Sequence, residues 1–378
     1  MKIAIICNSY PTKKNKINQI FIKNLVDELN KDSIQVKVFY NKIYDLWGNA
    51  SNRKKIIFNL IKYLFFFLSQ IELLFKIKSF NVLNPHGVMI SGFIAVIFKK
   101  IFHIPVILHV HGGDLNIYPS SNIIYKKIYR FTIKNCDFIF ANSTDVKIKI
   151  LKYFNFKKKN LSVLSPGVNY NKFFELDKKI VYEEKIKINI NPAKFILMFA
   201  GSAIRRKGLD ILVNGLSNLS KNNLEKIHLL ICSDGPELES NKKKLKAIHH
   251  LGNSIFFLKK VNQEKLNILY NIADIFVFPS REEPLGLVGL EAIASGTPVI
   301  GSNVGGIKEY INNKNGFLFN PNKDSELTKL LSQIIQNPNE LKRIKKNIDK
   351  RQTSHDILIS KNTYINKVLE IINKTKKL

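Results

Sequence analysis

The feature that most constrains the fold is an alternation of short apolar runs with helix-length segments, which occurs twice along the chain. In the first half, helices are predicted at Gln19–Lys31 and Ile123–Lys134. The apolar runs around them are predicted to be strands: Lys2–Cys7, Gln35–Phe39, Val82–Asn84, Pro105–His109, Phe138–Ala141 and Ser162–Leu164. Strands that alternate with helices are typical of a parallel sheet covered on both faces.

The alternation pauses at Glu175–Pro192, a charged stretch without a core strand that is interpreted as a linker. Strands are then predicted at Phe195–Ala200, His228–Cys232, Ile255–Leu258, Ile275–Phe278, Pro298–Ile300 and Gly316–Phe319. Helices are predicted at Gly208–Ser220, Glu237–His250, Gln263–Ile272, Leu287–Ser295 and Ser325–Gln336.

These 378 residues predict two doubly wound domains, residues 1–178 and 179–350. A basic helical tail, 351–378, follows them and can pack back on the first domain. Ligands of such sheets bind outside the carboxyl ends of the strands. The cleft between the two domains is therefore the expected site.

The chain is strongly basic, with a formal net charge of +31 from 60 Lys and Arg against 29 Asp and Glu. A basic surface attracts anionic lipid or a phosphorylated substrate, although a general abundance of Lys, Ile, Asn and Phe explains the charge equally well. Nucleic acid is not expected as a partner, because no RNA-binding strand signature or zinc-finger spacing is present. Three separate cysteines in apolar runs indicate buried thiols, and the short apolar N-terminus is predicted to be a first strand and not a signal sequence. A cytoplasmic location is expected.

The most apolar stretch, Ile56–Phe80, contains Lys62, Glu72, Lys76 and Lys78. Its uninterrupted part is far shorter than the roughly 20 residues that cross a bilayer. Two interpretations stay open. The stretch forms a helix packed on the sheet, or it lies on an anionic membrane at the inner face of the plasma membrane, with Phe65, Phe66, Phe67, Leu68 and Ile71 exposed.

Several catalytic motifs are absent from the sequence. No Gly-x-Gly-x-x-Gly follows the first strand, and no P-loop, Asp-x-Asp, His-Glu-x-x-His or Gly-x-Ser-x-Gly occurs. A dinucleotide dehydrogenase or P-loop enzyme is therefore not predicted. No metal and no cofactor are expected.

The segment Phe278–Ile300 carries the strongest functional signal. A strand ends at a proline, a loop rich in carboxylates follows, and a helix begins near Gly286. The amides at the start of that helix, including those of Leu287 and Val288, predict an anion site suited to phosphate. Glu283 and Glu291 would accept hydrogen bonds from hydroxyls on either side of a bound diphosphate.

This Glu-x7-Glu element, followed by Glu-Ala-x-Ala-x-Gly-x-Pro-Val, resembles the signature of the large retaining glycosyltransferase family 4. Further segments resemble motifs of the same family: Val304–Glu309, Gly316–Phe319, Ser233–Pro236, Ser165–Asn169 and His111–Asp114. The resemblance covers nearly the whole chain. It implies the GT-B fold, a nucleotide-sugar donor as co-substrate and a retaining outcome.

The resemblance also implies the roles of individual residues. Arg206 and Lys207, in a basic loop that enters a helix, would clamp the diphosphate, and Ser202 lies where the family often has arginine. His111, after the strand Pro105–His109, would donate a hydrogen bond to a sugar hydroxyl or carbonyl.

Three more residues are acceptor-side candidates. Asp114 would orient its loop or contact the acceptor. Tyr10 and Gln19 lie in the first loop, and Gln19 stands where the family has glycine. His109 is predicted to be structural, and the role of His86 is open.

The resulting expectation is a hexosyltransferase or related transferase. It would move a sugar to a hydroxyl of a growing bacterial-type surface glycan or a glycolipid acceptor. A sugar-nucleotide epimerase of similar fold is one alternative. A basic non-enzymatic protein that binds membranes or nucleic acid is the other. Release of nucleoside diphosphate with and without an acceptor separates the three.

Overall fold

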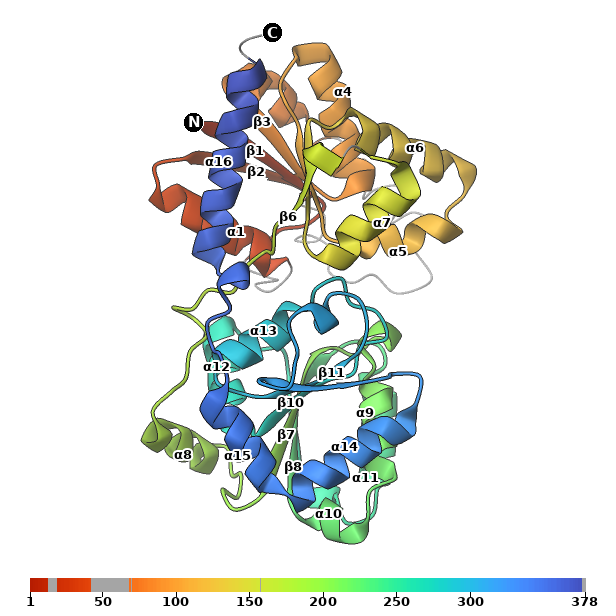
Figure 1. The fold of residues 1–378 in the computed structure, drawn as a ribbon, viewed down its shortest axis with the longest axis vertical. Helices are drawn as coiled ribbons and strands as arrows, with labels where there is room; N and C mark the ends of the chain where they lie inside the picture. Colours follow the sequence, from red (N-terminus) through yellow and green to blue (C-terminus); the bar gives the residue numbers. More distant parts are fainter. Residues whose placement is uncertain (13–18, 42–67, 69, 157, 376–378) are drawn as a thin grey trace. The chain divides into compact units, whose positions relative to one another are not determined.

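The computed structural model describes residues 1–12, 19–41, 68, 70–156 and 158–375. It divides into two compact units, Met1–Gly167 with Ile357–Leu378, and Val168–Asp356 (Figure 1). The boundary precedes the predicted residue 178 because the intervening chain bonds to the second unit. The amides of Phe174 and Leu176 donate to the side-chain oxygens of Asn267 and Asn271 over 3.1 and 2.7 Å.

The first unit contains a six-stranded parallel sheet in the order β2-β1-β3-β4-β5-β6. Its strands are β1 (Lys2–Cys7), β2 (Gln35–Tyr40), β3 (Val82–His86), β4 (Ile107–Val110), β5 (Phe138–Ala141) and β6 (Leu161–Val163). Its helices are α1 (Ile20–Lys31), α4 (Phe93–Phe102), α5 (Gly113–Ile117), α6 (Ile123–Asn135), α7 (Thr144–Phe154) and α16 (Ile357–Thr375).

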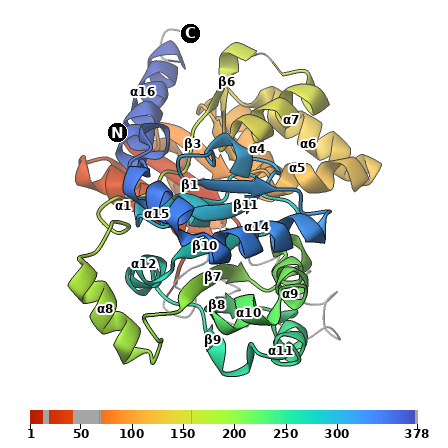
Figure 2. The same cartoon turned by 60° about the horizontal axis from the view of Figure 1, so that its bottom comes forward.

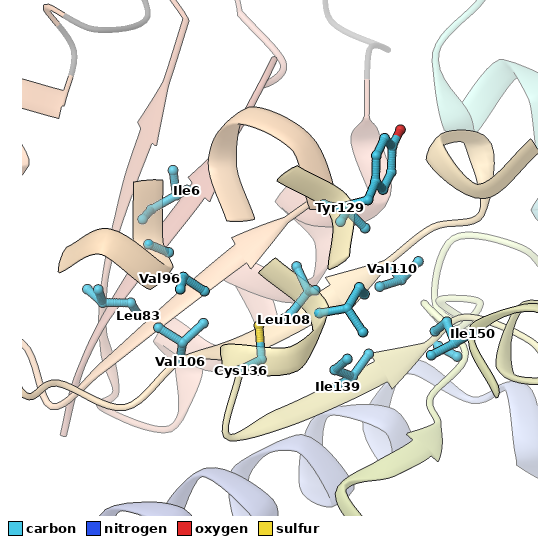
Figure 3. Close-up of a cluster of buried hydrophobic side chains, with 14 of the residues drawn as sticks. Ile6, Leu83, Val96, Val106, Leu108, Val110, Tyr129, Cys136, Ile139 and Ile150 are labelled. Carbon is cyan, nitrogen blue, oxygen red and sulfur yellow. The ribbon is translucent and has the colours of Figure 1, made fainter. Parts of the chain in front are cut away.

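Helices cover both faces of this sheet, which explains why the inner strands β1, β4 and β5 are mostly apolar and buried. On one face, Leu108 of β4 packs in one cluster with Val96 of α4 and with Cys136, which directly follows α6 (Figure 3). On the other face, Tyr364 and Val368 of α16 join the cluster around β1 and α1. The C-terminal helix is therefore part of the first unit.

The second unit has a parallel sheet in the order β12-β11-β10-β7-β8-β9. Its strands are β7 (Phe195–Ser202), β8 (Ile227–Asp234), β9 (Ile255–Leu258), β10 (Ile275–Phe278), β11 (Val299–Ser302) and β12 (Gly316–Phe319). Its helices are α8 (Lys178–Lys187), α9 (Leu209–Ser217), α10 (Lys221–Glu225), α11 (Leu238–Lys246), α12 (Gln263–Ile272), α13 (Leu287–Ala294), α14 (Asp324–Gln336) and α15 (Pro338–Asn347). Helices α9 and α14 cover one face of this sheet, and α12 covers the other (Figure 2). Helix α13 lies on the same face as α12 (Figure 1).

Three expectations about organisation need comment. The stretch Glu175–Pro192, predicted as a linker, contains α8 and lies within the second unit, where Glu184 pairs with Lys265 of α12. Residues 56–67 of the apolar stretch lie outside the described residues, whereas Leu68 and Ile71 are exposed. Within the described part of the chain, no helix combines the length and apolar character needed to cross a bilayer.

Candidate active site

The candidate donor site lies at the carboxyl ends of β7 and β10, which are neighbours in the second sheet. The strand order reverses between them, and open α/β sheets bind ligands at such a switch point. The loops after these two strands contact each other directly. The amide of Arg281 donates to the carbonyl of Arg206 over 2.8 Å, and its guanidinium forms two 2.7 Å hydrogen bonds with Asp210.

Gly208 makes this contact sterically feasible. Its φ is +70°, in the left-handed region, and a Cβ there would lie 1.9 Å from the carbonyl oxygen of Pro279. Only glycine fits that space without moving one of the two loops. Gly208 thus allows the loop that contains Arg206 and Lys207 to lie against the loop that follows β10.

The two loops bring together the predicted charged residues. The Lys207 ammonium forms an ion pair with the carboxylate of Glu283, and Arg206 Nη1 lies 3.7 Å from Glu283 Oε2. Glu283 is only 9% exposed. The Lys207 ammonium also lies 5.5 Å from the centre of the Phe278 ring. The buried Glu283 carboxylate thus lies beside the largely buried Lys207 and the more exposed Arg206 at the switch point.

Helix α13 begins beside this cluster. Gly286, with φ of +89°, is the residue before its first turn, and Leu287 and Val288 follow as its first two residues. The Gly289 amide donates to the Gly286 carbonyl, while helix geometry leaves the first amides without intrahelical acceptors. The start of α13 can therefore bind an anion held by Arg206 and Lys207.

Glu291 lies on the second turn of α13 and is 8% exposed. Burial raises the pKa of its carboxyl to about 7, and the neighbouring Tyr270 hydroxyl and Lys172 ammonium offset only part of that effect. Glu291 is therefore divided between its two protonation states near neutral pH. A ligand hydroxyl that donates to it would favour the carboxylate.

Gly305 and Gly306, to which the sequence assigned no role in the site, lie against the backbone of Glu283. The Gly306 amide donates to the carbonyl of Glu283 over 3.0 Å. A Cβ at Gly305 would lie 2.0 Å from the same oxygen. The resemblance of Val304–Glu309 to a family motif was the sequence signal that could have indicated this contact. The Tyr310 hydroxyl, which donates to the Gly286 carbonyl over 2.8 Å, had no comparable signal.

In the first unit, His86, His109 and His111 cluster at the carboxyl ends of β3 and β4. His86 Nδ1 lies 2.9 Å from His111 Nε2, and the His86 and His109 rings are 4.5 Å apart. Burial lowers the pKa of all three imidazoles, that of His111 to about 4. All three are therefore neutral at physiological pH.

These three side chains also form the kind of group that can hold a metal ion, because their ring nitrogens lie within 4.8 Å of one another. An ion bound between His86 and His111 would have to break their 2.9 Å hydrogen bond. Phe21 of α1 packs on His111 with ring centres 4.7 Å apart. The sequence left the role of His86 open and did not place Phe21 beside His111.

The other predicted site residues are Asp114, Ser202, Tyr10 and Gln19, and each has contacts of its own. Asp114 Oδ2 accepts the Val88 amide over 2.6 Å, which supports its orienting role. Ser202 is the last residue of β7, and Tyr10 stacks near Tyr40 after β1. Gln19 precedes α1 with φ of +50°, so it keeps the left-handed backbone conformation that glycine favours.

Comparisons with known proteins agree with this architecture. Residues 181–351 match the glycosyl transferases group 1, and residues 19–172 match Glycosyltransferase Family 4. An uncharacterized glycosyltransferase of Methanocaldococcus jannaschii is 28% identical over 260 residues, covering 66% of this chain and 65% of the relative. The match thus spans slightly less than two thirds of that relative. A D-inositol 3-phosphate glycosyltransferase of Corynebacterium urealyticum is 24% identical over 355 residues, covering 85% and 82%.

Among solved structures, Anabaena HepE in complex with UDP and glucose has a TM-score of 0.77 at 15% identity, covering 98% of this chain and 100% of HepE. Two parallel doubly wound sheets with this structural likeness define a GT-B fold. The two family matches together cover most of the chain, and the protein belongs to the group 1 glycosyltransferases of family 4. That is the family its Glu283–Glu291 motif resembles. The expected cleft between the two units stays a prediction.

Proposed function

We propose that the protein transfers a sugar from a nucleoside diphosphate sugar to an acceptor hydroxyl, with retention of anomeric configuration. The observation that carries this proposal is the cluster of Arg206, Lys207 and Glu283 beside the start of α13. Cations and helix amides bind the diphosphate, while buried carboxylates accept hydrogen bonds from hydroxyls. A nucleotide sugar presents both kinds of group.

In the proposed complex, Glu291 accepts hydrogen bonds from the ribose hydroxyls. Arg206, Lys207 and the first amides of α13 hold the diphosphate, with Ser202 at the end of β7. Lys207 is paired with Glu283 in the free protein. Donor binding draws its ammonium toward phosphate and leaves Glu283 to accept from the sugar ring.

The reaction then requires a stabilised leaving group. The bond between the anomeric carbon and the β-phosphate oxygen breaks, and its electron pair leaves with the nucleoside diphosphate. The acceptor oxygen forms its bond on the same face of the sugar, and its proton passes to the departing phosphate oxygen. Lys207 and Arg206 neutralise the charge that grows on that phosphate, so no metal is required in this scheme.

For the acceptor, we propose a lipid-linked or surface glycan of bacterial type, approached at the inner face of the plasma membrane. The high positive charge of the chain supports contact with anionic lipid. Phe75 is 84% exposed in the first unit, and the nearby Leu68 and Leu74 are 47% and 42% exposed. Exposed apolar side chains on a basic protein are typical of peripheral membrane contact.

The test is release of nucleoside diphosphate from a panel of nucleotide sugars, with and without candidate acceptors. UDP-sugars lead the panel because UDP is bound by the structural relative HepE. Lys207→Ala should lower turnover on the order of 10²–10³-fold, because one charge-stabilising contact is lost. Lys265→Ala on α12, which removes an ion pair with Glu184 of α8, is the matched control. Wild-type turnover by Lys207→Ala contradicts the assignment. Conversion of the donor without an acceptor would indicate an epimerase.

A further inference from the structure

A chain of hydrogen bonds runs through the buried polar groups beside His111 and begins at Asn84. The Asn84 amide nitrogen donates to the carbonyl of Ile107 over 2.6 Å. Because a carbonyl oxygen only accepts, this contact fixes which side of the Asn84 amide is nitrogen. Asn84 Oδ1 therefore points the other way, where it also accepts the Tyr364 hydroxyl of α16 over 3.0 Å.

The fixed amide determines the protonation of His86. His86 Nε2 lies 3.3 Å from Asn84 Oδ1, which is an acceptor, so Nε2 carries the proton. Burial lowers the pKa of His86 well below its usual value, so the ring is neutral and holds one proton. Its Nδ1 is then a lone-pair acceptor, and the partner of that atom must donate.

That partner is Nε2 of His111, at 2.9 Å. His111 Nε2 therefore carries the single proton of a neutral ring whose pKa burial lowers to about 4. The remaining nitrogen, Nδ1, is a lone-pair acceptor. It is buried and has no hydrogen-bond partner within the part of the chain that the structure describes.

A second unpartnered acceptor belongs to Asn142, which lines the same cavity as His111. Asn142 donates its amide nitrogen to the His111 carbonyl over 3.0 Å, which leaves its buried Oδ1 without a partner among the described residues. The cavity is lined by His111, Asn142 and Phe21, among others, and leaves about 20 Å³ for the centre of a water-sized group. This is room for about one hydroxyl or water oxygen.

We propose that Asn84 and His86 are positioning residues that hold His111 in its Nε2–H tautomer, so that the cavity binds a substrate hydroxyl as a hydrogen-bond donor. The assignment of that hydroxyl to a sugar rests on the proposed function. The role is opposite to the hydrogen-bond donation expected from the sequence. A carbonyl, carboxylate or phosphate oxygen placed between His111 Nδ1 and Asn142 Oδ1 would meet two acceptors and is disfavoured there.

The tautomer is measured by NMR on the full-length protein with ¹⁵N-labelled histidine, through long-range proton–nitrogen correlations at neutral pH. His111→Gln identifies the His111 signals by their loss. A protonated Nε2 and an unprotonated Nδ1 are expected. The proposal is overturned if Nδ1 is protonated or if the ring is an imidazolium. It is also overturned if the spectrum changes when a chelator is added, because the histidines would then hold a metal ion.

Variants test the cause of the tautomer. Asn84→Leu removes the acceptor for His86 and should give a mixture of His111 tautomers. Tyr364→Phe should leave the wild-type tautomer, because the Ile107 carbonyl still fixes the Asn84 amide. Equal changes in both variants, or none in Asn84→Leu, overturn the positioning role. The wild-type spectrum remains decisive if Asn84→Leu does not fold.

Turnover tests the class of ligand. His111→Glu keeps only acceptors at this position and His111→Lys keeps only donors. The Glu variant should release nucleoside diphosphate about tenfold faster than the Lys variant, or more. In the Lys variant a buried donor would face the donating hydroxyl, and such a mismatch costs roughly 1–3 kcal/mol. Equal loss or the reverse order overturns the hydroxyl assignment. An inactive wild-type protein would instead contradict the proposed function and leave the NMR result standing.

Discussion

Replacement of Glu291 by glutamine should change how stability depends on pH. The carboxyl pKa is raised from 4.5 to about 7 in the folded protein, chiefly by burial. Protonation is therefore favoured by folding. The contribution of this group to the free energy of unfolding is fully present below the unfolded pKa and is lost as pH rises toward 7.

The magnitude follows from the raised pKa. A tenfold change in a protonation equilibrium corresponds to 1.36 kcal/mol, so the cost of ionising Glu291 in the free protein is on the order of 3 kcal/mol. Glutamine keeps the shape and cannot ionise. The free energy of unfolding of Glu291→Gln, relative to wild type, should therefore rise by up to about 3 kcal/mol between about pH 5 and about pH 8.

The assay is urea denaturation of both proteins at the two pH values, without nucleotide. Glu264→Gln, at an exposed position on α12, is the control for exchanging a carboxylate for an amide, and the change with pH should be larger for Glu291→Gln than for this variant. A pH-independent difference for Glu291→Gln would refute the reasoning, because it would mean that the buried carboxyl keeps an ordinary pKa.

Other expectations follow from the same structure. Affinity for nucleoside diphosphates, measured by calorimetry, should rise with pH up to about 7, because the ribose hydroxyls bind the Glu291 carboxylate. Glu291→Gln should lose this pH dependence, and an unchanged dependence in the variant contradicts that role. Gly208→Ala should cost about 2 kcal/mol or more in urea denaturation, since its Cβ would meet the Pro279 carbonyl, while Gly252→Ala, with open space around it, should cost little. The protein should sediment with anionic vesicles at low salt and not with neutral ones; indifference to lipid charge argues against the membrane proposal.

Much of the fold could be predicted because parallel strands buried on both faces are continuous apolar runs. Each predicted strand overlaps one in the structure, and α12 has the bounds that its helical pattern indicated. The stretch that contains α8 is charged and has no core strand, so the sequence predicts a linker there. In the structure α8 has no buried side chain. Glu184 of α8 and the preceding Phe174 and Leu176 amides contact α12. These contacts join residues distant in sequence, which periodicity does not report.

The site divides in the same way. Glu283, Lys207 and Arg206 were predicted from two loops that follow strands, and the switch point places these loops in contact. The link between Tyr364 and Asn84 joins positions 280 residues apart, so no local pattern indicates it. The left-handed backbone of Gln19 could not be predicted either, because glycine is the residue that normally adopts this conformation.

The most direct test of the central claim is a thermal-shift measurement with nucleoside diphosphates on wild type and Lys207→Ala. A ligand at 100 times its dissociation constant should stabilise the wild-type protein by roughly 2.7 kcal/mol. The account predicts a clear upward shift for at least one nucleoside diphosphate, strongly reduced in Lys207→Ala and kept in Lys265→Ala. No shift with any nucleoside diphosphate, or an equal shift in Lys207→Ala, would contradict a diphosphate site at β7 and β10.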